Sequence, residues 1–201
     1  MPLSEQWIVT NARGESLDYR QGESYPAAPE YELCRCGQSG DKPFCDGSHE
    51  QARFDGTETA SRRPYLDQAE TFAGPTMSLT DAKSLCAFVR FCDPEGRSWN
   101  LVMQTDDPEA RRLVAHQAGH CPGGRLVAWD RATGKSVEPE FEPSLGLIED
   151  TAERVSGPIW VRGGIPVVSA DGEVYEVRNQ IALCRCGRST NLPFCDGSHA
   201  T

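Results

Sequence analysis

Residues 33–49 read L-C-R-C-G-Q-S-G-D-K-P-F-C-D-G-S-H, and residues 183–199 read L-C-R-C-G-R-S-T-N-L-P-F-C-D-G-S-H. The two stretches share the frame L-C-R-C-G-x-S-x-x-x-P-F-C-D-G-S-H, so their cysteines and histidine have identical spacing. We call residues 34–49 cassette 1 and residues 184–199 cassette 2. Three thiols and one imidazole within sixteen residues form a typical set of metal ligands. Because the set occurs twice, metal binding is the function that the sequence indicates first.

The spacing within a cassette indicates how four donor groups can meet. A Cys-x-Cys pair at the end of a strand directs two thiolates to one side through the turn at the following glycine, Gly37 or Gly187. A loop of eight residues then returns the third thiolate. In Cys-Asp-Gly-Ser-His the aspartate, Asp46 or Asp196, can cap a short helix that places cysteine and histidine on neighbouring turns. We therefore expect a strand, a loop and one helical turn to assemble each set.

A set of three cysteines and one histidine has two interpretations. Zinc uses such a set in tetrahedral structural sites. A [2Fe–2S] cluster also needs four ligands, usually cysteines, and histidine replaces some of them in centres of higher reduction potential. The ligand types and their spacing do not by themselves separate these two metals.

The full frame resembles the CDGSH iron–sulfur family, the mitoNEET-like proteins, at every motif position of both copies. The resemblance implies two [2Fe–2S] clusters, the first held by Cys34, Cys36, Cys45 and His49 and the second by Cys184, Cys186, Cys195 and His199. Members of the family pair around a two-fold axis, so it also implies a monomer whose two copies pair internally. Two independent modules are the alternative. Histidine ligation predicts a pH-dependent potential and clusters that acid releases.

Three further cysteines, Cys86, Cys92 and Cys121, lie between the cassettes. The first two have the spacing of the first and third cysteines of a bacterial ferredoxin run, and Cys121 is followed by proline, as is the distant cysteine of that run. The segment resembles the divergent single-cluster ferredoxin domain found beside CDGSH modules in bacterial proteins. The resemblance implies a third cluster, either [3Fe–4S] on the three thiolates or [4Fe–4S] completed by His116, His120 or an exogenous ligand. Three buried thiols without a cluster are the alternative.

The composition limits the partners and the location of this chain of 201 residues. Acidic residues outnumber basic ones 30 to 20, giving a formal charge of −10, which argues against nucleic acid and favours a partner with a basic face. No apolar run is long enough to span a membrane, and the first residues do not resemble a secretory signal. Nine cysteines in such a chain fit metal ligation better than disulfides. We therefore expect a cytoplasmic protein with no membrane contact.

The 19 glycines and 14 prolines indicate a turn-rich chain with small cores. We expect an α+β fold of small modules stapled by metal, with short antiparallel strands and a few short helices. Residues 1–60 are predicted to form the first CDGSH module, residues 61–155 a ferredoxin-like middle domain, and residues 156–201 the second module. The two modules are expected to pair as a pseudo-dimer.

Local signals predict the individual elements. Strands are expected at residues 7–9, 30–33, 126–129 and 180–183, and a hairpin within residues 165–177. A helix is expected from residue 108 to Gly119, with Asp107 as its N-cap and proline at its first position. A shorter helix is expected after Asp81.

These features predict a protein that transfers single electrons, with any third cluster as a relay. The alternative is a cluster carrier, or a redox and pH sensor, that donates its labile clusters to apo-proteins. The partner is accordingly a redox protein or an apo-protein acceptor. The sequence offers neither a Ser-His-Asp arrangement nor a carboxylate pair for acid–base catalysis, so we do not expect an enzyme.

Overall fold

Both ends of the chain contribute to one five-stranded sheet. The computed structural model describes residues 1–200, and the strand order of this sheet is β2-β1-β6-β7-β8. Its strands are β1 (Leu3–Thr10), β2 (Ser16–Tyr25), β6 (Ser144–Asp150), β7 (Val155–Arg162) and β8 (Gln180–Leu183). All neighbours are antiparallel except β1 and β6, which run parallel. A parallel pair requires a long crossover, and here the whole middle of the chain supplies it.

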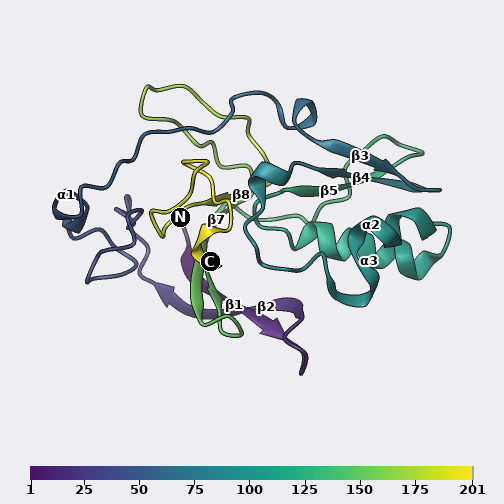
Figure 1. The fold of residues 1–201 in the computed structure, drawn as a ribbon, viewed down its shortest axis with the longest axis horizontal. Helices are drawn as coiled ribbons and strands as arrows, with labels where there is room; N and C mark the ends of the chain where they lie inside the picture. Colours follow the sequence, from purple (N-terminus) through teal and green to yellow (C-terminus); the bar gives the residue numbers. More distant parts are fainter. Residues whose placement is uncertain (201) are drawn as a thin grey trace.

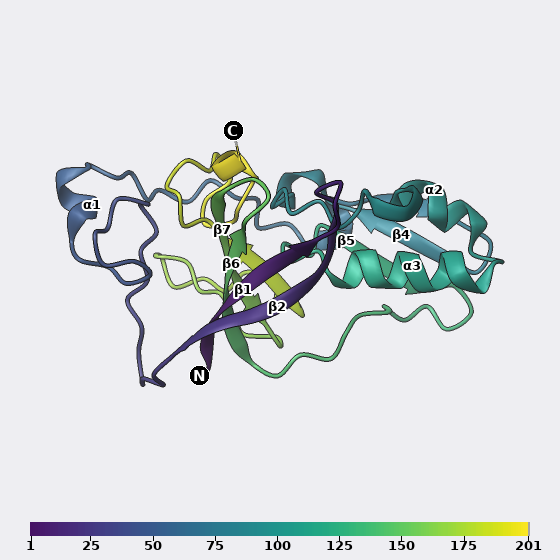
Figure 2. The ribbon, with the colours of Figure 1, turned by 90° about the horizontal axis from the view of Figure 1, so that it is seen from below.

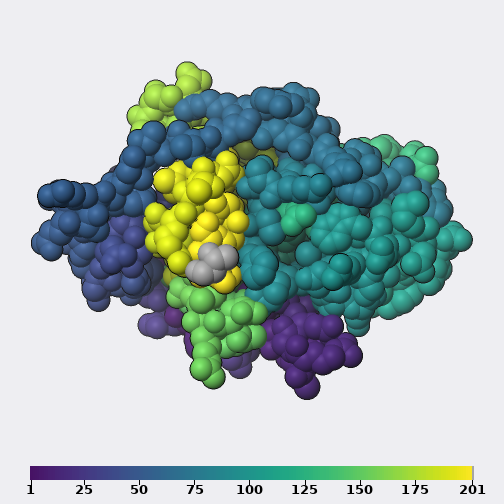
Figure 3. Space-filling model, in the orientation of Figure 1, coloured from purple at the N-terminus to yellow at the C-terminus, as the bar shows by residue number. Residues whose placement is uncertain are grey.

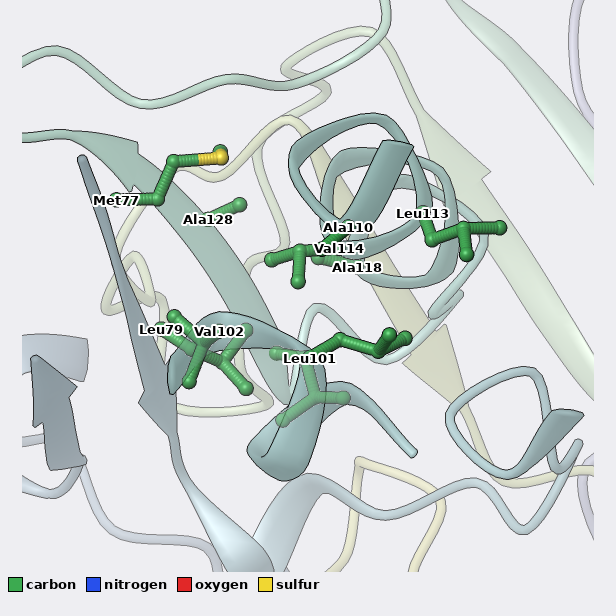
Figure 4. Close-up of a cluster of buried hydrophobic side chains, with 10 residues drawn as sticks. Met77, Leu79, Leu101, Val102, Ala110, Leu113, Val114, Ala118 and Ala128 are labelled. Carbon is green, nitrogen blue, oxygen red and sulfur yellow. The ribbon is translucent and has the colours of Figure 1, made fainter. Parts of the chain in front are cut away.

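The middle of the chain forms a second, smaller sheet with helices packed on it. Its antiparallel strands have the order β3-β4-β5, and they are β3 (Glu70–Ala73), β4 (Met77–Asp81) and β5 (Leu126–Asp130). Helices α2 (Ser98–Leu101) and α3 (Pro108–Gly119) lie beside this sheet at the right of the view in Figure 1. Leu79, Val102 and Val114 are fully buried in the core between strands and helices (Figure 4). Burial of such side chains stabilises the unit by about 1.5–3 kcal/mol each.

The boundaries of α3 agree with the signals in the sequence. The side chain of Asp107 accepts a hydrogen bond from the backbone N–H of Glu109 at 3.0 Å, and proline occupies the first helical position. A cap of this kind contributes about 1 kcal/mol. The helix ends at Gly119, as predicted.

The remaining helical elements are single turns. They are α1 (Ser48–Gln51), η1 (Tyr65–Asp67), η2 (Lys83–Leu85), η3 (Pro94–Gly96), η4 (Val102–Gln104) and η5 (Ser198–Ala200). The fold is therefore α+β with small sheets and few short helices, as the composition predicts. None of the helices within residues 1–200 is long and apolar enough to cross a membrane.

The predicted strands at 126–129 and 180–183 are confirmed, and the one at 7–9 is the centre of the longer β1. The predicted strand at 30–33 is wrong, because only Leu33 makes a bridge, to Phe44. The hairpin within 165–177 is reduced to one bridge between Val168 and Val174. In both places the ladder is too short to form a regular strand.

The short helix predicted after Asp81 is reduced to one helical turn, and Asp81 does not cap it. Asp81 is the last residue of β4, and its carboxylate pairs with Arg125 at 2.6 Å. Because the ion pair uses this side chain, it does not cap a helix, and the chain makes only the turn η2, which begins after Ala82.

Cassette 2 occupies the centre of the molecule. Figures 1 and 2 show it, in yellow, between α1 on one side and the helices α2 and α3 on the other. The space-filling view in Figure 3 shows its surface bordered by cassette 1 and by the middle of the chain. Strand β6 lies within residues 61–155 but pairs with β1 and β7, so the middle of the chain also enters the larger sheet.

Candidate metal centres

Each cassette is a narrow loop closed by backbone hydrogen bonds. In cassette 1 the N–H of Cys34 donates to the carbonyl of Pro43 at 2.8 Å, and the N–H of Cys45 donates to the carbonyl of Glu32 at 2.7 Å. The equivalent bonds of cassette 2 run from Cys184 to Pro193 at 3.0 Å and from Cys195 to Ala182 at 2.8 Å. These bonds bring the third cysteine back beside the first two, as the spacing predicts.

The four donor atoms of a cassette lie in two close pairs. In cassette 1 the Sγ atoms of Cys34 and Cys36 are 3.7 Å apart, and Sγ of Cys45 is 3.4 Å from Nδ1 of His49. The corresponding distances in cassette 2 are 3.7 Å for Cys184 and Cys186, and 3.5 Å for Cys195 and His199. Two thiolates on one tetrahedral metal, each at about 2.3 Å from it, lie about 3.7 Å apart. Each pair therefore has the separation expected of two ligands on one metal.

The pairs do not merge into larger groups. Within residues 1–200 there is no group of three or more histidine, cysteine, aspartate or glutamate residues placed to hold one metal ion. Each cassette thus offers two separate pairs of donor atoms, and the histidine contributes its Nδ1 atom to one of them.

Backbone amides surround the thiols of the Cys-x-Cys turns. Burial alone would raise the pKa of Cys34, but hydrogen bonds from the amides of Ser39 and Gly37, among others, lower it. The pKa of Cys184 falls to about 5, first because the thiol of Cys186 donates to it and then because backbone amides do. Donors of this kind stabilise a thiolate, and they tune a metal bound to it.

The last residues of each cassette are held by an aspartate. Asp46 accepts hydrogen bonds from the amide of Ser48 at 3.0 Å and from that of Gly40 at 2.7 Å. The Ser48 side chain, followed by these two amides, keeps the pKa of Asp46 well below the usual range. Asp196 makes the same bonds to Ser198 and Thr190. The predicted capping role is thus modified, since the aspartate closes a turn just before the helix and Gly47 holds the N-cap position of α1.

The two Cys-x-Cys turns lie against each other. Gly37 and Gly187 both have φ of +74°, as the predicted turns require. A Cβ atom on Gly37 would lie 2.7 Å from the carbonyl oxygen of Cys186, and one on Gly187 would lie 2.5 Å from that of Cys36. The contact is reciprocal, and only glycine allows both the backbone conformation and the close approach.

The arginines between the ligand cysteines differ in their contacts. Arg35 reaches across to cassette 2, where it donates to the carbonyls of Cys184 and Pro193. Arg185 instead pairs with Glu149 of β6 at 2.6 Å. The sequence left open whether these arginines form ion pairs or face solvent, because their partners are distant in the chain.

The three middle cysteines lie within electrostatic reach of one another. Burial raises the pKa of Cys92 to about 12, and the charges of Cys121 and Cys86 add to this shift. Burial also raises the pKa of Cys121, with a further contribution from Cys86. The backbone amides of Leu126 and Arg125 act in the opposite direction and lower the pKa of Cys121. The topology therefore gathers these thiols, although they do not form a single-ion site.

His120 does not offer a free nitrogen to these thiols. Its Nδ1 faces the carbonyl of His116 at 2.8 Å, and its Nε2 faces the carboxylate of Asp18 at 3.1 Å. The Nε2 atom of His116 faces the carbonyl of Leu17 at 3.0 Å. These contacts agree with a supporting role rather than ligation for His120.

Three supporting residues were not assigned from the sequence. Ser39 and its counterpart Ser189 each accept and donate within the loop, and their hydroxyls bond the carbonyls of Phe44 and Phe194 at 2.7 Å. The signal available in the sequence was that serine occupies the same position in both copies of the frame. Arg125 pairs with Asp81, and the charge of Cys86 contributes to its raised pKa; it carried no such signal because it lies outside the repeat.

The comparison with protein families identifies both ends of the chain. Residues 3–50 and 156–200 each match the family described as the iron-binding zinc finger of CDGSH type. These two segments belong to the CDGSH iron-binding family. No curated protein and no solved structure matches the chain significantly.

Proposed function

We propose that each cassette holds one [2Fe–2S] cluster and that the protein transfers single electrons. The observation that carries this proposal is the division of each ligand set into two close pairs, at 3.7 and 3.4 Å in cassette 1. A single tetrahedral zinc ion would require all four donors to approach one another equally. Two irons need two donors each, and this is the arrangement that the pairs favour.

The ligands in these pairs determine what a bound cluster supplies. A [2Fe–2S] cluster provides one-electron redox chemistry, and replacing a thiolate by neutral imidazole makes its reduction easier. The chain contributes the backbone amides that donate to Cys34 and Cys184, which stabilise thiolate charge at both sites. The contact between the turns at Gly37 and Gly187 supports internal pairing of the two cassettes within one chain. No catalytic side chains are required for such a role.

We further propose a third cluster on Cys86, Cys92 and Cys121. The backbone of the loop that carries Cys92 supports this assignment. Four non-glycine residues of the loop have a positive φ, namely Phe88 (φ 53°), Arg90 (φ 62°), Glu95 (φ 56°) and Arg97 (φ 63°). Each costs about 1–2 kcal/mol, and such residues concentrate where a chain is held around a ligand. A [3Fe–4S] cluster uses three thiolates, so neither His116 nor His120 is required.

Cluster donation is the second candidate function, and the position of His49 favours it. His49 is exposed, whereas His199 has only 7 % of its surface exposed. A histidine in contact with water can be protonated and displaced, which would release a cluster from cassette 1. A donor would lose its cluster to an apo-ferredoxin on mixing, whereas an electron carrier would keep its clusters while it cycles with a reductase.

The test is the content of iron and acid-labile sulfide per chain after anaerobic purification, with EPR spectra before and after dithionite. About seven irons, with a signal as isolated that reduction removes, are expected for two [2Fe–2S] clusters and one [3Fe–4S] cluster. About four irons and no signal until reduction would overturn the third cluster alone. Zinc without sulfide would overturn the whole proposal.

A further inference from the structure

The same motif position has opposite surroundings in the two cassettes. Gly47 and Gly197 have nearly the same backbone, with φ of +83° and +87°. A Cβ atom on Gly47 would meet nothing within 4 Å, whereas one on Gly197 would lie 3.0 Å from Cβ of Phe88 and 3.2 Å from the carbonyl oxygen of Cys86. The Cys-Asp-Gly-Ser-His edge is thus open in cassette 1 and covered in cassette 2.

The proposed ligands at the open edge of cassette 1 are also more exposed than those at the covered edge of cassette 2. Cys195 and His199 are 3 % and 7 % exposed, whereas Cys45 is half-buried and His49 is exposed. Burial also raises the pKa of Cys195 to about 12. The two sites have identical ligands, so the difference arises from what lies against them.

The segment that covers cassette 2 belongs to the middle of the chain and carries Cys86. Ala87 packs with Ala182 and Cys195 in one buried cluster. Asn191 of cassette 2 donates to the carbonyl of Ser84 at 2.9 Å. A residue that we assign to the third cluster is therefore adjacent to a ligand of the second cluster.

We infer that the two cassettes have different partners, the covered edge of cassette 2 facing the Cys86 segment and the open edge of cassette 1 facing another protein. We define the open edge as residues 45–50. In cassette 2 the equivalent edge is covered by the segment that carries Cys86. This contact shows that the edge can pack against a partner that carries a redox group. Figures 1 and 2 show α1, which contains His49, at the end of the molecule away from α2 and α3. This inference rests on the proposed electron transfer.

The charges beside the open edge determine the kind of partner. Asp46 and Glu50 belong to the edge, and the backbone of Glu32 bonds directly to Cys45. These three acidic residues outnumber Arg53, an exposed cation whose backbone N–H donates to the carbonyl of Glu50. The side chains of Glu32 and Glu50 are exposed, and they make no ion pair or hydrogen bond within residues 1–200. The partner is therefore a one-electron redox protein with a basic face, which opposite charge would steer to the edge.

The experiment uses the full-length holoprotein, reduced with dithionite and desalted, and ferricytochrome c as a basic one-electron acceptor. The test variant is Glu32→Lys with Glu50→Lys. The matched control is Glu140→Lys with Glu173→Lys, which makes the same change in charge at exposed positions that do not belong to the edge. Stopped-flow absorption gives the rate of cytochrome reduction, and calorimetry with the oxidised proteins gives the affinity of the complex.

The test variant is expected to lower both the rate and the affinity about tenfold at low ionic strength, and the loss should shrink as salt is added. The control variant should stay within about twofold of the unchanged protein. Equal losses in the two variants, or no loss in either, would overturn the proposal that a basic redox protein docks at the open edge. A protein that takes up no electrons from dithionite would instead overturn the proposed function itself.

Discussion

Substitution of Gly187 by alanine tests the contact between the two cassettes. The left-handed backbone at φ +74° costs an alanine about 1 kcal/mol. The added Cβ atom would lie 2.5 Å from the carbonyl oxygen of Cys36, which belongs to a turn held by its own hydrogen bonds and cannot move freely. Overpacking of this kind costs a further ~2 kcal/mol. The total of about 3 kcal/mol should lower the melting temperature of a chain of this size by about 9 °C.

The control is Gly172→Ala, because Gly172 has φ of +88° and a Cβ atom there would meet nothing within 4 Å. This variant has only the backbone cost of about 1 kcal/mol and should melt about 3 °C lower. Thermal unfolding of both holoproteins is followed by circular dichroism at one scan rate. If Gly187→Ala melts no lower than Gly172→Ala, the two turns are not in contact and the internal pairing of the cassettes is wrong.

Three further predictions concern the metal sites and the middle unit. Acid should bleach the visible absorption in two steps, cassette 1 first, because His49 is exposed whereas burial lowers the pKa of His199 and keeps it neutral to lower pH. His49→Cys should remove the first step and His199→Cys the second; one step that neither variant changes would contradict the assignment. Cys121→Ser should abolish the EPR signal of the isolated protein and lower the iron content from about seven to about four per chain, whereas Cys34→Ser should leave that signal in place. Asp81→Asn should destabilise the protein by about 3–5 kcal/mol in urea unfolding, because Arg125 loses its buried partner, and Asp130→Asn at the more exposed pair with Arg111 should cost less than about 1 kcal/mol.

Burial of His199 in cassette 2 makes the stability of the folded protein depend on pH. The pKa of His199 is lowered from 6.5 because burial disfavours the charged imidazole. An unfolded chain therefore binds this proton more readily, and stability falls as the pH decreases below about 6.5. Cassette 1 has the same ligand types, but no segment of residues 1–200 equivalent to the one that carries Cys86 covers it. We therefore expect the two sites to respond differently to acid.

The insertion of a middle unit between two similar modules explains this asymmetry. In a symmetric pair both Cys-Asp-Gly-Ser-His edges would have the same surroundings. Here residues 84–88 contact cassette 2 through Asn191 and Gly197, and the related Gly47 of cassette 1 stays open. Arg35 and Arg185 also differ, because Arg35 donates to the other cassette whereas Arg185 pairs with Glu149 of β6.

Local chemistry was readable from the sequence. The ligand pairs, the glycine turns at Gly37 and Gly187, and the cap of α3 at Asp107 each depend on residues close together in the chain. The spacing of such residues constrains their geometry directly, because a turn or a helical cap involves only a few neighbouring backbone groups. The strand expected at residues 30–33 failed because strand formation also needs a partner, which local sequence does not specify.

The sequence by itself indicated which groups are candidate metal ligands and how each cassette closes, because these properties arise from short-range covalent spacing. Only the tertiary structure decided that β1 pairs in parallel with β6, that Asp81 pairs with Arg125 instead of capping a helix, and that the Cys86 segment covers cassette 2. Each of these contacts joins residues far apart in the chain. Their formation depends on how whole units bury their surfaces against one another, and two identical motifs carry no information about which of them will be covered.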